Sequence, residues 1–233
     1  MSDVKENFDK LAKRELRDHG RNIIIAALSV LPVVGGSISS LLSEYIPEWK
    51  EKRVLNFIRE LGEKLEEVKD RINQEYLKTE EFAFLFEQTF LRVFRDHQEE
   101  KLKVYKAILI NSCTKSNFDT SEKEYFLSLV DRLQGVHILI LSLFFNPDSF
   151  MSKHKVKLPE VTVNPKEIIL TSLQPFNFGE ELIVYGIRDL EKMGLLSNIS
   201  GDMDIKSSVP AKTRLKEALS AFGKKFCEFI ILE

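Results

Sequence analysis

The chain has 233 residues, of which 43% are hydrophobic and 30% are charged, so it can bury a core and is not of the disordered class. Lys plus Arg number 34 and Asp plus Glu number 36, and the resulting net charge of -2 excludes a strongly basic nucleic-acid coat. Only 10 Gly and 7 Pro argue against a turn-dense β-sandwich, and Cys113 and Cys227 match no disulfide, zinc or redox spacing. The first 21 residues are too densely charged for a cleavable secretory signal, which predicts a cytoplasmic protein.

Residues 2–21 predict an amphipathic helix, and the segment after it, residues 22–46, is unusually apolar. No charged residue occurs from Asn22 to Ser43, a length that could span a membrane. Pro32 and the pair Gly35-Gly36 divide this stretch into two pieces, each suited to a buried core helix or to a re-entrant hairpin. Core packing is the preferred interpretation, and membrane association is the alternative. The residues expected to insert in that alternative are Ile24, Leu28, Pro32, Val34, Gly35 and Gly36.

Pro47 and Glu48 suit the first turn of a long helix, which the spacing predicts over 48–76. Its apolar residues alternate steps of four and three, which is a heptad seam. The seam could pack against neighbouring helices of the same domain, which is the commoner case, or pair with a partner helix, including a second copy. The proposed partner face consists of Ile58, Leu61, Leu65 and Val68.

Further helices are predicted along the middle of the chain. Thr79 is a suitable cap for a phenylalanine-rich helix, and Ser121 with Glu124 predicts a capping box. Residues 136–145 are almost wholly apolar, as expected of a buried core helix, and residues 151–163 predict an extended connector. The expected architecture is mainly α: a helical bundle over 1–150, the connector, and a small separate domain over 164–233.

The last eighty residues predict a helix over 180–193 that ends at Gly194, with its apolar residues directed inward. A polar stretch from Ser197 to Leu215 then predicts a two-stranded hairpin, and Ser220 caps a closing helix. The residues expected to face inward on the first of these helices are Leu182, Tyr185, Leu190 and Met193.

This ending resembles a winged-helix module, with RDLEKMGLL, a polar hairpin and ALSAFGKKFCEFI in that order. The resemblance covers roughly residues 164–233 and implies fold more than function, because winged helices bind several kinds of partner. Most of the chain also resembles bacterial helical proteins of the abortive-infection alpha type. That likeness lies in the glycine-bent segment ending at Pro47, the long charged helix, EEFAFLFEQTF, and the stretch from LLSN to FGKKF. It implies a role in defence against phage and supplies no catalytic residues.

No catalytic signature occurs in the sequence. The four histidines lack ligand spacing, and Asp96 beside His97 is better explained as a charged helix break than as an acid–base pair. Gly-rich phosphate loops and the nucleophile-elbow motif are missing as well. We therefore expect no enzymatic activity, no metal, no cofactor and no small-molecule substrate.

A basic stretch near the C-terminus is the only pattern that favours nucleic acid. Six basic residues and one acidic residue lie between Lys206 and Lys225, but the helix that would enter the groove has four acidic and two basic residues. A DNA-contacting patch would consist of Lys206, Lys212, Arg214 and Lys216.

The preferred function is therefore a non-catalytic bacterial interaction protein, acting through helix faces on a protein partner or on a second copy, with phage defence as its setting. The alternatives are a membrane-active effector that inserts residues 22–46 and a DNA-binding regulator that uses the C-terminal domain.

Overall fold

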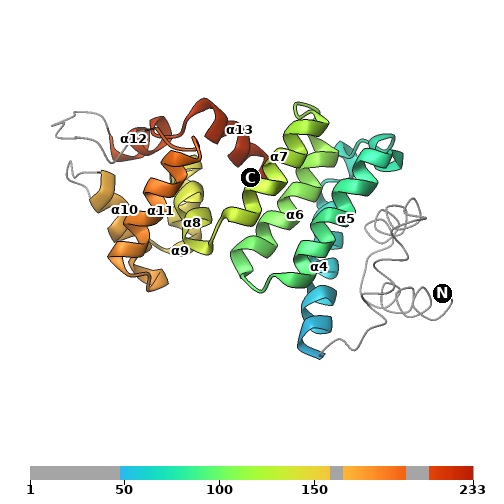
Figure 1. Cartoon of the computed structure of the whole chain (residues 1–233), viewed down its shortest axis with the longest axis horizontal. Helices are drawn as coiled ribbons and strands as arrows, with labels where there is room; N and C mark the ends of the chain where they lie inside the picture. Colours follow the sequence, from blue (N-terminus) through green and yellow to red (C-terminus); the bar gives the residue numbers. More distant parts are fainter. Residues whose placement is uncertain (1–47, 158–164, 198–209, 233) are drawn as a thin grey trace. The chain divides into compact units, whose positions relative to one another are not determined.

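The computed structural model describes residues 48–157, 165–197 and 210–232. Within these ranges the chain is mainly helical, with ten α-helices, α4 to α13, and no β-strand (Figure 1). The predicted mainly α class is confirmed. The chain divides into two compact units between Leu129 and Val130, inside α7 (Thr120–Arg132). We call them unit 1 and unit 2.

Unit 1 is built around α6 (Glu99–Thr114), which packs against α4 (Glu48–Glu67) and α5 (Glu80–Arg95) (Figure 1). Two 3₁₀ turns, η1 (Lys69–Arg71) and η2 (Tyr76–Lys78), connect α4 to α5. Ten of the sixteen residues of α6 are buried, which is expected of a helix with neighbours on several sides.

The phenylalanine-rich helix α5 begins where the sequence predicts, because the Thr79 hydroxyl accepts a hydrogen bond from the Phe82 amide at 3.2 Å. Phe82, Phe86 and Phe90 follow one another at i,i+4 spacing and are all buried. Their ring centroids lie 6.2 and 5.9 Å apart, within the range of favourable aromatic pairs. Of the other two phenylalanines of α5, Phe94 is half-buried and Phe84 is 46% exposed.

Helix α4 is shorter than the predicted 48–76, because it ends at Glu67. The residues that follow turn back onto α6. The Asn73 amide donates to the Cys113 carbonyl oxygen at 2.8 Å, and the Asn73 side-chain oxygen accepts from the amides of Glu75 and Tyr76 at 3.1 Å each. An Asn side chain that satisfies the following backbone amides stabilises a turn in place of another helical turn.

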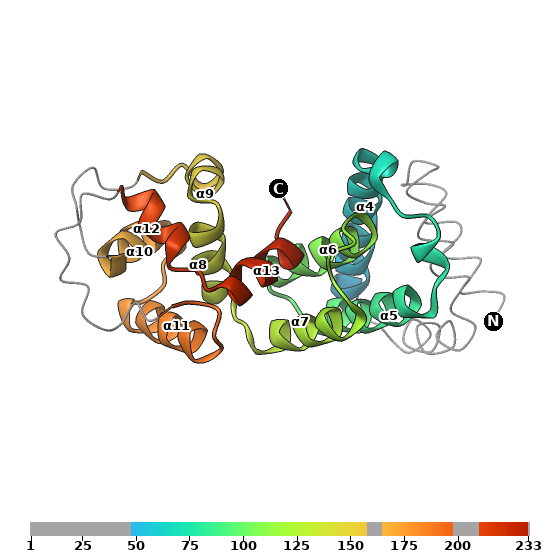
Figure 2. The ribbon, with the colours of Figure 1, turned by 90° about the horizontal axis from the view of Figure 1, so that it is seen from above.

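Unit 2 is organised around α8 (Gly135–Phe145), whose residues are almost all apolar. Eight of its eleven residues are buried, which confirms the predicted buried core helix. A helix that is apolar around its whole circumference needs neighbours on every side. Figure 2 shows α8 among the helices that contact it, which are α9 (Pro147–His154), α10 (Pro165–Leu173), α11 (Glu180–Lys192), α12 (Ala211–Glu217) and α13 (Ala221–Ile230).

The unit to which α8 and α9 belong differs from the predicted domain bounds. Both helices belong to unit 2 by their contacts, whereas the sequence pattern grouped α8 and the first half of α9 with the bundle over 1–150. Asn146 separates the two helices and caps α9, because its side-chain oxygen accepts from the Ser149 amide at 3.1 Å. The first part of the predicted connector is helical, since α9 continues to His154.

The predicted hairpin is wrong in its second half, because residues 211–217 form α12. Residues 198–209, where the rest of that hairpin was expected, lie outside the described part of the chain. An isolated antiparallel bridge joins Leu196 to Leu219, with the Ser197 amide donating to the Ala218 carbonyl oxygen at 2.8 Å. A wing requires paired strands, so the predicted winged-helix domain is not confirmed within the described residues.

The start of α13 packs directly on the backbone of residue 195. The Ser220 hydroxyl caps this helix as predicted, accepting from the Gly223 amide at 2.8 Å, and it donates to the Gly194 carbonyl oxygen at 2.6 Å. A Cβ atom at Gly223 would lie 1.9 Å from the Leu195 carbonyl oxygen. Glycine is therefore required at this position for the close approach of helix and loop.

Substitution Gly223→Ala should destabilise the protein by about 3 kcal/mol, because the added methyl group can be accommodated only if the backbone moves. Urea unfolding of the full chain, followed by circular dichroism, measures this change. The control is Gly179→Ala, where a Cβ meets nothing within 4 Å. The control should change stability by less than about 1 kcal/mol. Equal stabilities of the two variants would contradict the close packing of α13 on residue 195.

Candidate functional site

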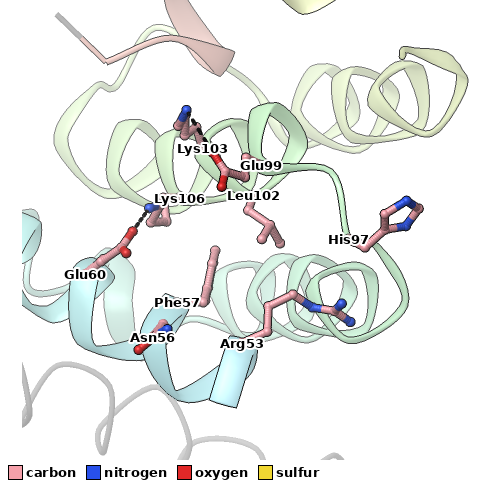
Figure 3. Close-up of a pocket in the computed structure, with 9 residues that line it drawn as sticks. All are labelled: Arg53, Asn56, Phe57, Glu60, His97, Glu99, Leu102, Lys103 and Lys106. Carbon is pink, nitrogen blue, oxygen red and sulfur yellow. Dashed lines mark hydrogen bonds and ion pairs between the residues drawn. The ribbon is translucent and has the colours of Figure 1, made fainter. Parts of the chain in front are cut away.

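Unit 1 contains a pocket of about 430 Å³ between α4 and the start of α6 (Figure 3). Figure 3 shows Phe57 and Leu102 in its middle, with polar and charged side chains around them. Seven of its nine lining residues are polar or charged, whereas small-molecule sites are lined mostly by apolar side chains with a few polar groups. The residues lining it are Arg53, Asn56, Phe57, Glu60, His97, Glu99, Leu102, Lys103 and Lys106.

The cationic side chains of this pocket already have partners within the chain. Lys106 forms an ion pair with Glu60, and Lys103 Nζ lies 3.9 Å from Glu99 Oε2 (Figure 3). The Arg53 guanidinium donates to the Phe94 carbonyl oxygen at 3.1 Å. Because these groups are engaged by carboxylates and a carbonyl, the pocket does not concentrate one sign of charge toward a ligand.

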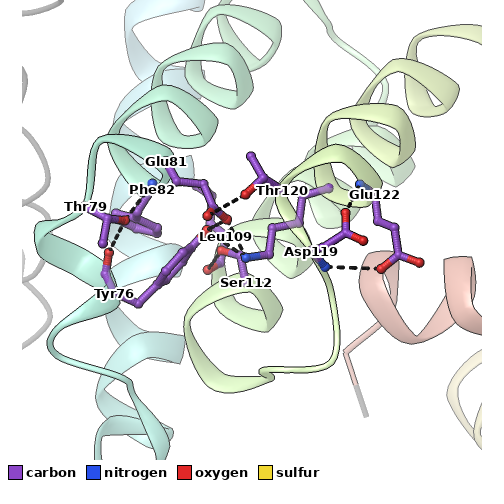
Figure 4. Close-up of polar contacts among 10 residues, drawn as sticks. Tyr76, Thr79, Glu81, Phe82, Leu109, Ser112, Asp119, Thr120 and Glu122 are labelled. Carbon is purple, nitrogen blue, oxygen red and sulfur yellow. Dashed lines mark hydrogen bonds and ion pairs between the residues drawn. The ribbon is translucent and has the colours of Figure 1, made fainter.

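A second polar site in unit 1 joins η2, α5 and α7, and we call it the Lys123 cluster: Tyr76, Glu81, Thr120 and Lys123. Figure 4 shows Tyr76, Glu81 and Thr120 of this cluster. Lys123 is buried and donates to Glu81 Oε1 at 2.6 Å and to the Tyr76 hydroxyl at 3.1 Å. Tyr76 and Thr120 each donate a hydroxyl hydrogen bond to the Glu81 carboxylate, at 2.9 and 2.7 Å. The ammonium also lies 4.2 Å from the centre of the Tyr76 ring, a cation–π distance.

The electrostatics of the Lys123 cluster favour a fixed ion pair. Burial acts to raise the pKa of Glu81, but hydrogen bonds from Lys123, Thr120 and Tyr76 outweigh it, so the pKa lies below the usual value. Burial, and then the hydrogen bond to Glu81, raise the pKa of Tyr76 well above its ordinary range. At neutral pH the Glu81 carboxyl group is therefore ionised and the Tyr76 hydroxyl group is protonated. The cluster holds three elements together, and neither group has a pKa near neutral pH that would suit proton transfer.

Asp96, considered above as half of an acid–base pair, instead stabilises the turn between α5 and α6. Its carboxylate accepts from the Gln98 amide at 3.1 Å and lies 3.3 Å from the ammonium of Lys101, which is buried. Burial acts to raise the pKa of Asp96, but the Gln98 amide and Lys101 more than offset it, and the pKa is lowered. His97, the other member of the pair, is exposed and lines the pocket.

The other histidines and cysteines in the described part of the chain are packed into the core or among aromatic rings, and His19 lies outside it. His137 is buried, and its Nδ1 accepts from the Gln134 amide at 2.8 Å. The His154 ring lies 4.6 Å from that of Phe150, between ring centroids. Burial raises the pKa of Cys113 to about 12, which disfavours the reactive thiolate. In the part of the chain that the structure describes, no three His, Cys, Asp or Glu side chains come together as a metal site.

The predicted basic patch is only partly available to a ligand. Lys212 forms an ion pair with Asp148 of α9, and Arg214 is half-buried with its Nε and Nη2 atoms enclosed. Lys216 is exposed, whereas Lys206 lies outside the described residues. The four residues therefore do not present one continuous cationic surface in the described part of unit 2.

The other two predicted surfaces have different outcomes. Ile58, Leu61 and Leu65 are 6%, 1% and 4% exposed and Val68 is half-exposed, so most of the proposed partner face packs inside unit 1. Packing against neighbouring helices, the first of the two alternatives, describes this seam. The apolar segment 22–46 lies outside the described residues. Among the helices that are described, none combines the length and hydrophobicity needed to cross a bilayer.

Among the described residues of unit 2, the most exposed large apolar side chains lie on α11, where the sequence interpretation was wrong for two residues. Tyr185 is 62% exposed and Leu182 is 48% exposed, although both were expected to face inward. The buried face consists of Ile183, Gly186, Ile187 and Leu190, of which only Leu190 was predicted to face inward, and Met193 is half-buried. We call the opposite side the α11 outer face, and its exposed residues are Glu181, Leu182, Tyr185, Arg188 and Lys192.

Gly186 explains why α11 has this orientation. A Cβ atom there would lie 3.3 Å from Ile140 and 3.4 Å from His137, so this side of α11 lies close against α8. Glycine has no Cβ atom, so at a position between Ile183 and Ile187 on the buried face it lets one helix approach another closely. The tyrosine next to it, Tyr185, is carried to the opposite side of the helix.

No protein-family model, no curated protein and no solved structure matches this chain.

Substitution Lys123→Met should destabilise the protein by about 1–3 kcal/mol, because the half-buried Glu81 loses its ion pair with Lys123 and Tyr76 loses a hydrogen-bond donor. The free energy of unfolding of this variant should also depend less on pH in the acidic range. In the unaltered chain the pKa of Glu81 is lower in the folded state, so its contribution is present above the unfolded pKa of about 4.3 and is lost as the pH falls through the folded pKa. Urea unfolding between pH 3 and pH 7 measures both effects.

The matched control is Lys78→Met, which removes an exposed ion pair with Glu75. It should change stability by less than about 0.5 kcal/mol and leave the acid dependence intact. If both variants behave alike, the Lys123 cluster does not hold unit 1 together.

Proposed function

We propose that this protein is a non-catalytic interaction protein that binds a protein partner through the α11 outer face. The observation that carries the proposal is the pair Leu182 and Tyr185, which are 48% and 62% exposed on a helix that is otherwise charged on that side. Exposed apolar side chains that stand together and are rimmed by charges are typical of partner-binding surfaces.

The chemistry of this pair suits a protein partner. Residues three apart on a helix are neighbours, so Leu182 and Tyr185 form one continuous patch. Tyrosine brings a large ring and a hydroxyl group at a small cost in side-chain entropy, and it is enriched at binding hot spots. The buried face of α11 packs on α8, so the patch stands on a supported helix.

The charges around the patch favour protein over nucleic acid. Glu180 and Glu181 lie at the N-terminus of α11, where a groove-binding helix would need cations or amides. In the same unit Lys212 is engaged by Asp148. A DNA-binding regulator is therefore the weaker proposal.

The winged-helix assignment is also a proposal. The Leu196–Leu219 bridge between α11 and α13 supports it, whereas α12 occupies part of the stretch in which a wing has paired strands. In that arrangement α11 is the helix that meets the partner. A role in phage defence rests on the sequence resemblance alone, and the membrane-active alternative rests on residues 22–46.

Site-specific photo-crosslinking tests the interaction proposal. The photoreactive residue p-benzoylphenylalanine replaces Tyr185 in the full chain, and cells of the native host that produce this variant are irradiated. We expect a discrete covalent adduct with one polypeptide, because a bound partner covers this side chain.

The control places the same photoreactive residue at Tyr125 of α7, which is 53% exposed in unit 1. We expect no discrete adduct from this position. The proposal is overturned if Tyr185 yields no adduct, or if both positions yield the same diffuse products, because the α11 outer face would then be an ordinary solvent-exposed surface.

A further inference from the structure

The α11 outer face carries charges of opposite sign at its two ends. Glu181 lies in the first turn and Arg188 lies two turns later, about 10 Å further along the axis. Tyr185 lies between them, and all three side chains are exposed. Lys192 extends the basic end, although it also lies 3.6 Å from Asp189. The structure records no ion pair for Glu181 or Arg188 within the described residues.

This distribution of charges on the α11 outer face is complementary to that of a second copy of the helix in the antiparallel orientation. If two copies of α11 lie antiparallel with their Tyr185 rings at a two-fold axis, Glu181 of each copy comes opposite Arg188 of the other. The two residues lie on the same flank of the exposed stripe, four before and three after Tyr185, so one symmetry operation forms both ion pairs. A parallel pairing would set Glu181 against Glu181 and Arg188 against Arg188.

We propose that the partner of the α11 outer face is a second copy of this chain, joined in an antiparallel helix pair with Leu182 and Tyr185 at its centre and Glu181–Arg188 ion pairs on one flank. This inference rests on the proposed function and names its partner. It moves self-association from the buried seam of α4, where the sequence suggested it, to a helix whose apolar residues are exposed.

The size of the surface sets the expected affinity. Helix α11 has 13 residues and is about 20 Å long, so one helix pair buries less than the roughly 1,200 Å² of a standard interface. The dimer is therefore weak, with a dissociation constant of about 10–100 μM. Its ion pairs are exposed at the rim, so high salt weakens it.

Charge reversal tests the pairing. The variants are Glu181→Lys, Arg188→Glu and the double variant with both changes in one chain, and sedimentation velocity over a concentration series measures self-association. Each single reversal places like charges opposite each other at both symmetric positions and should weaken the dimer about tenfold. The double variant should recover it. An equimolar mixture of the two single variants should form a heterodimer, because both basic positions of one chain then face both acidic positions of the other.

The control is Glu124→Lys, which makes the same change of charge at an exposed position of α7 and should leave the dimer unchanged. Circular dichroism verifies that every variant keeps its helices. The antiparallel pairing is overturned if the double variant and the mixture stay as weak as the single variants, or if the unaltered chain is monomeric at about 500 μM, well above the expected dissociation constant. In the latter case an adduct from Tyr185 with a different protein would leave the proposed function standing, whereas the absence of any adduct would overturn both.

Discussion

The apolar surface of α8 is the constraint on which the rest of unit 2 depends. Since residues 136–145 offer almost no polar side chain, this helix is stable only with other helices around it, and α9 to α13 all contact it. That enclosure leaves each surrounding helix with one inner and one outer side. Gly186 brings α11 close to α8, and the same contact directs Tyr185 away from the core. The proposed binding surface is thus a consequence of core packing.

Unit 1 relies on a different combination of interactions. Stacked phenylalanines on α5 and the many buried residues of α6 supply the apolar core. The Lys123 cluster adds an ion pair between the buried Lys123 and the half-buried Glu81, and its hydrogen bonds join η2, α5 and α7 at defined positions. Buried ion pairs often contribute little net stability relative to apolar packing, but removing one partner is costly, so the cluster favours one arrangement of these elements over others.

Many of the charged groups described in unit 1 form ion pairs and hydrogen bonds with one another. For this reason the proposed binding surface lies in unit 2 and not in unit 1. Lys106 and Lys103 of the pocket face carboxylates, and Asp96 and Glu81 are enclosed by hydrogen-bond donors. The α11 outer face differs, because its tyrosine and leucine remain exposed and its terminal charges are opposite in sign. A face of this kind is complementary in charge to the same face on a second copy of the chain. This complementarity is the basis of the proposed self-association.

The sequence by itself determined the mainly α class, the buried character of α8, and the caps at Thr79 and Ser220, because these depend on local periodicity and on side chains within one turn of a helix end. Local pattern did not determine where α4 ends, that residues 211–217 are helical, or which side of α11 faces the core. Leu182 and Tyr185 share a helical spacing with Leu190 that fits an inward face as well as Ile183 and Ile187 do. Only the tertiary structure decided between them, since the narrow side at Gly186 lets α11 approach α8 more closely than the side with a tyrosine ring would allow.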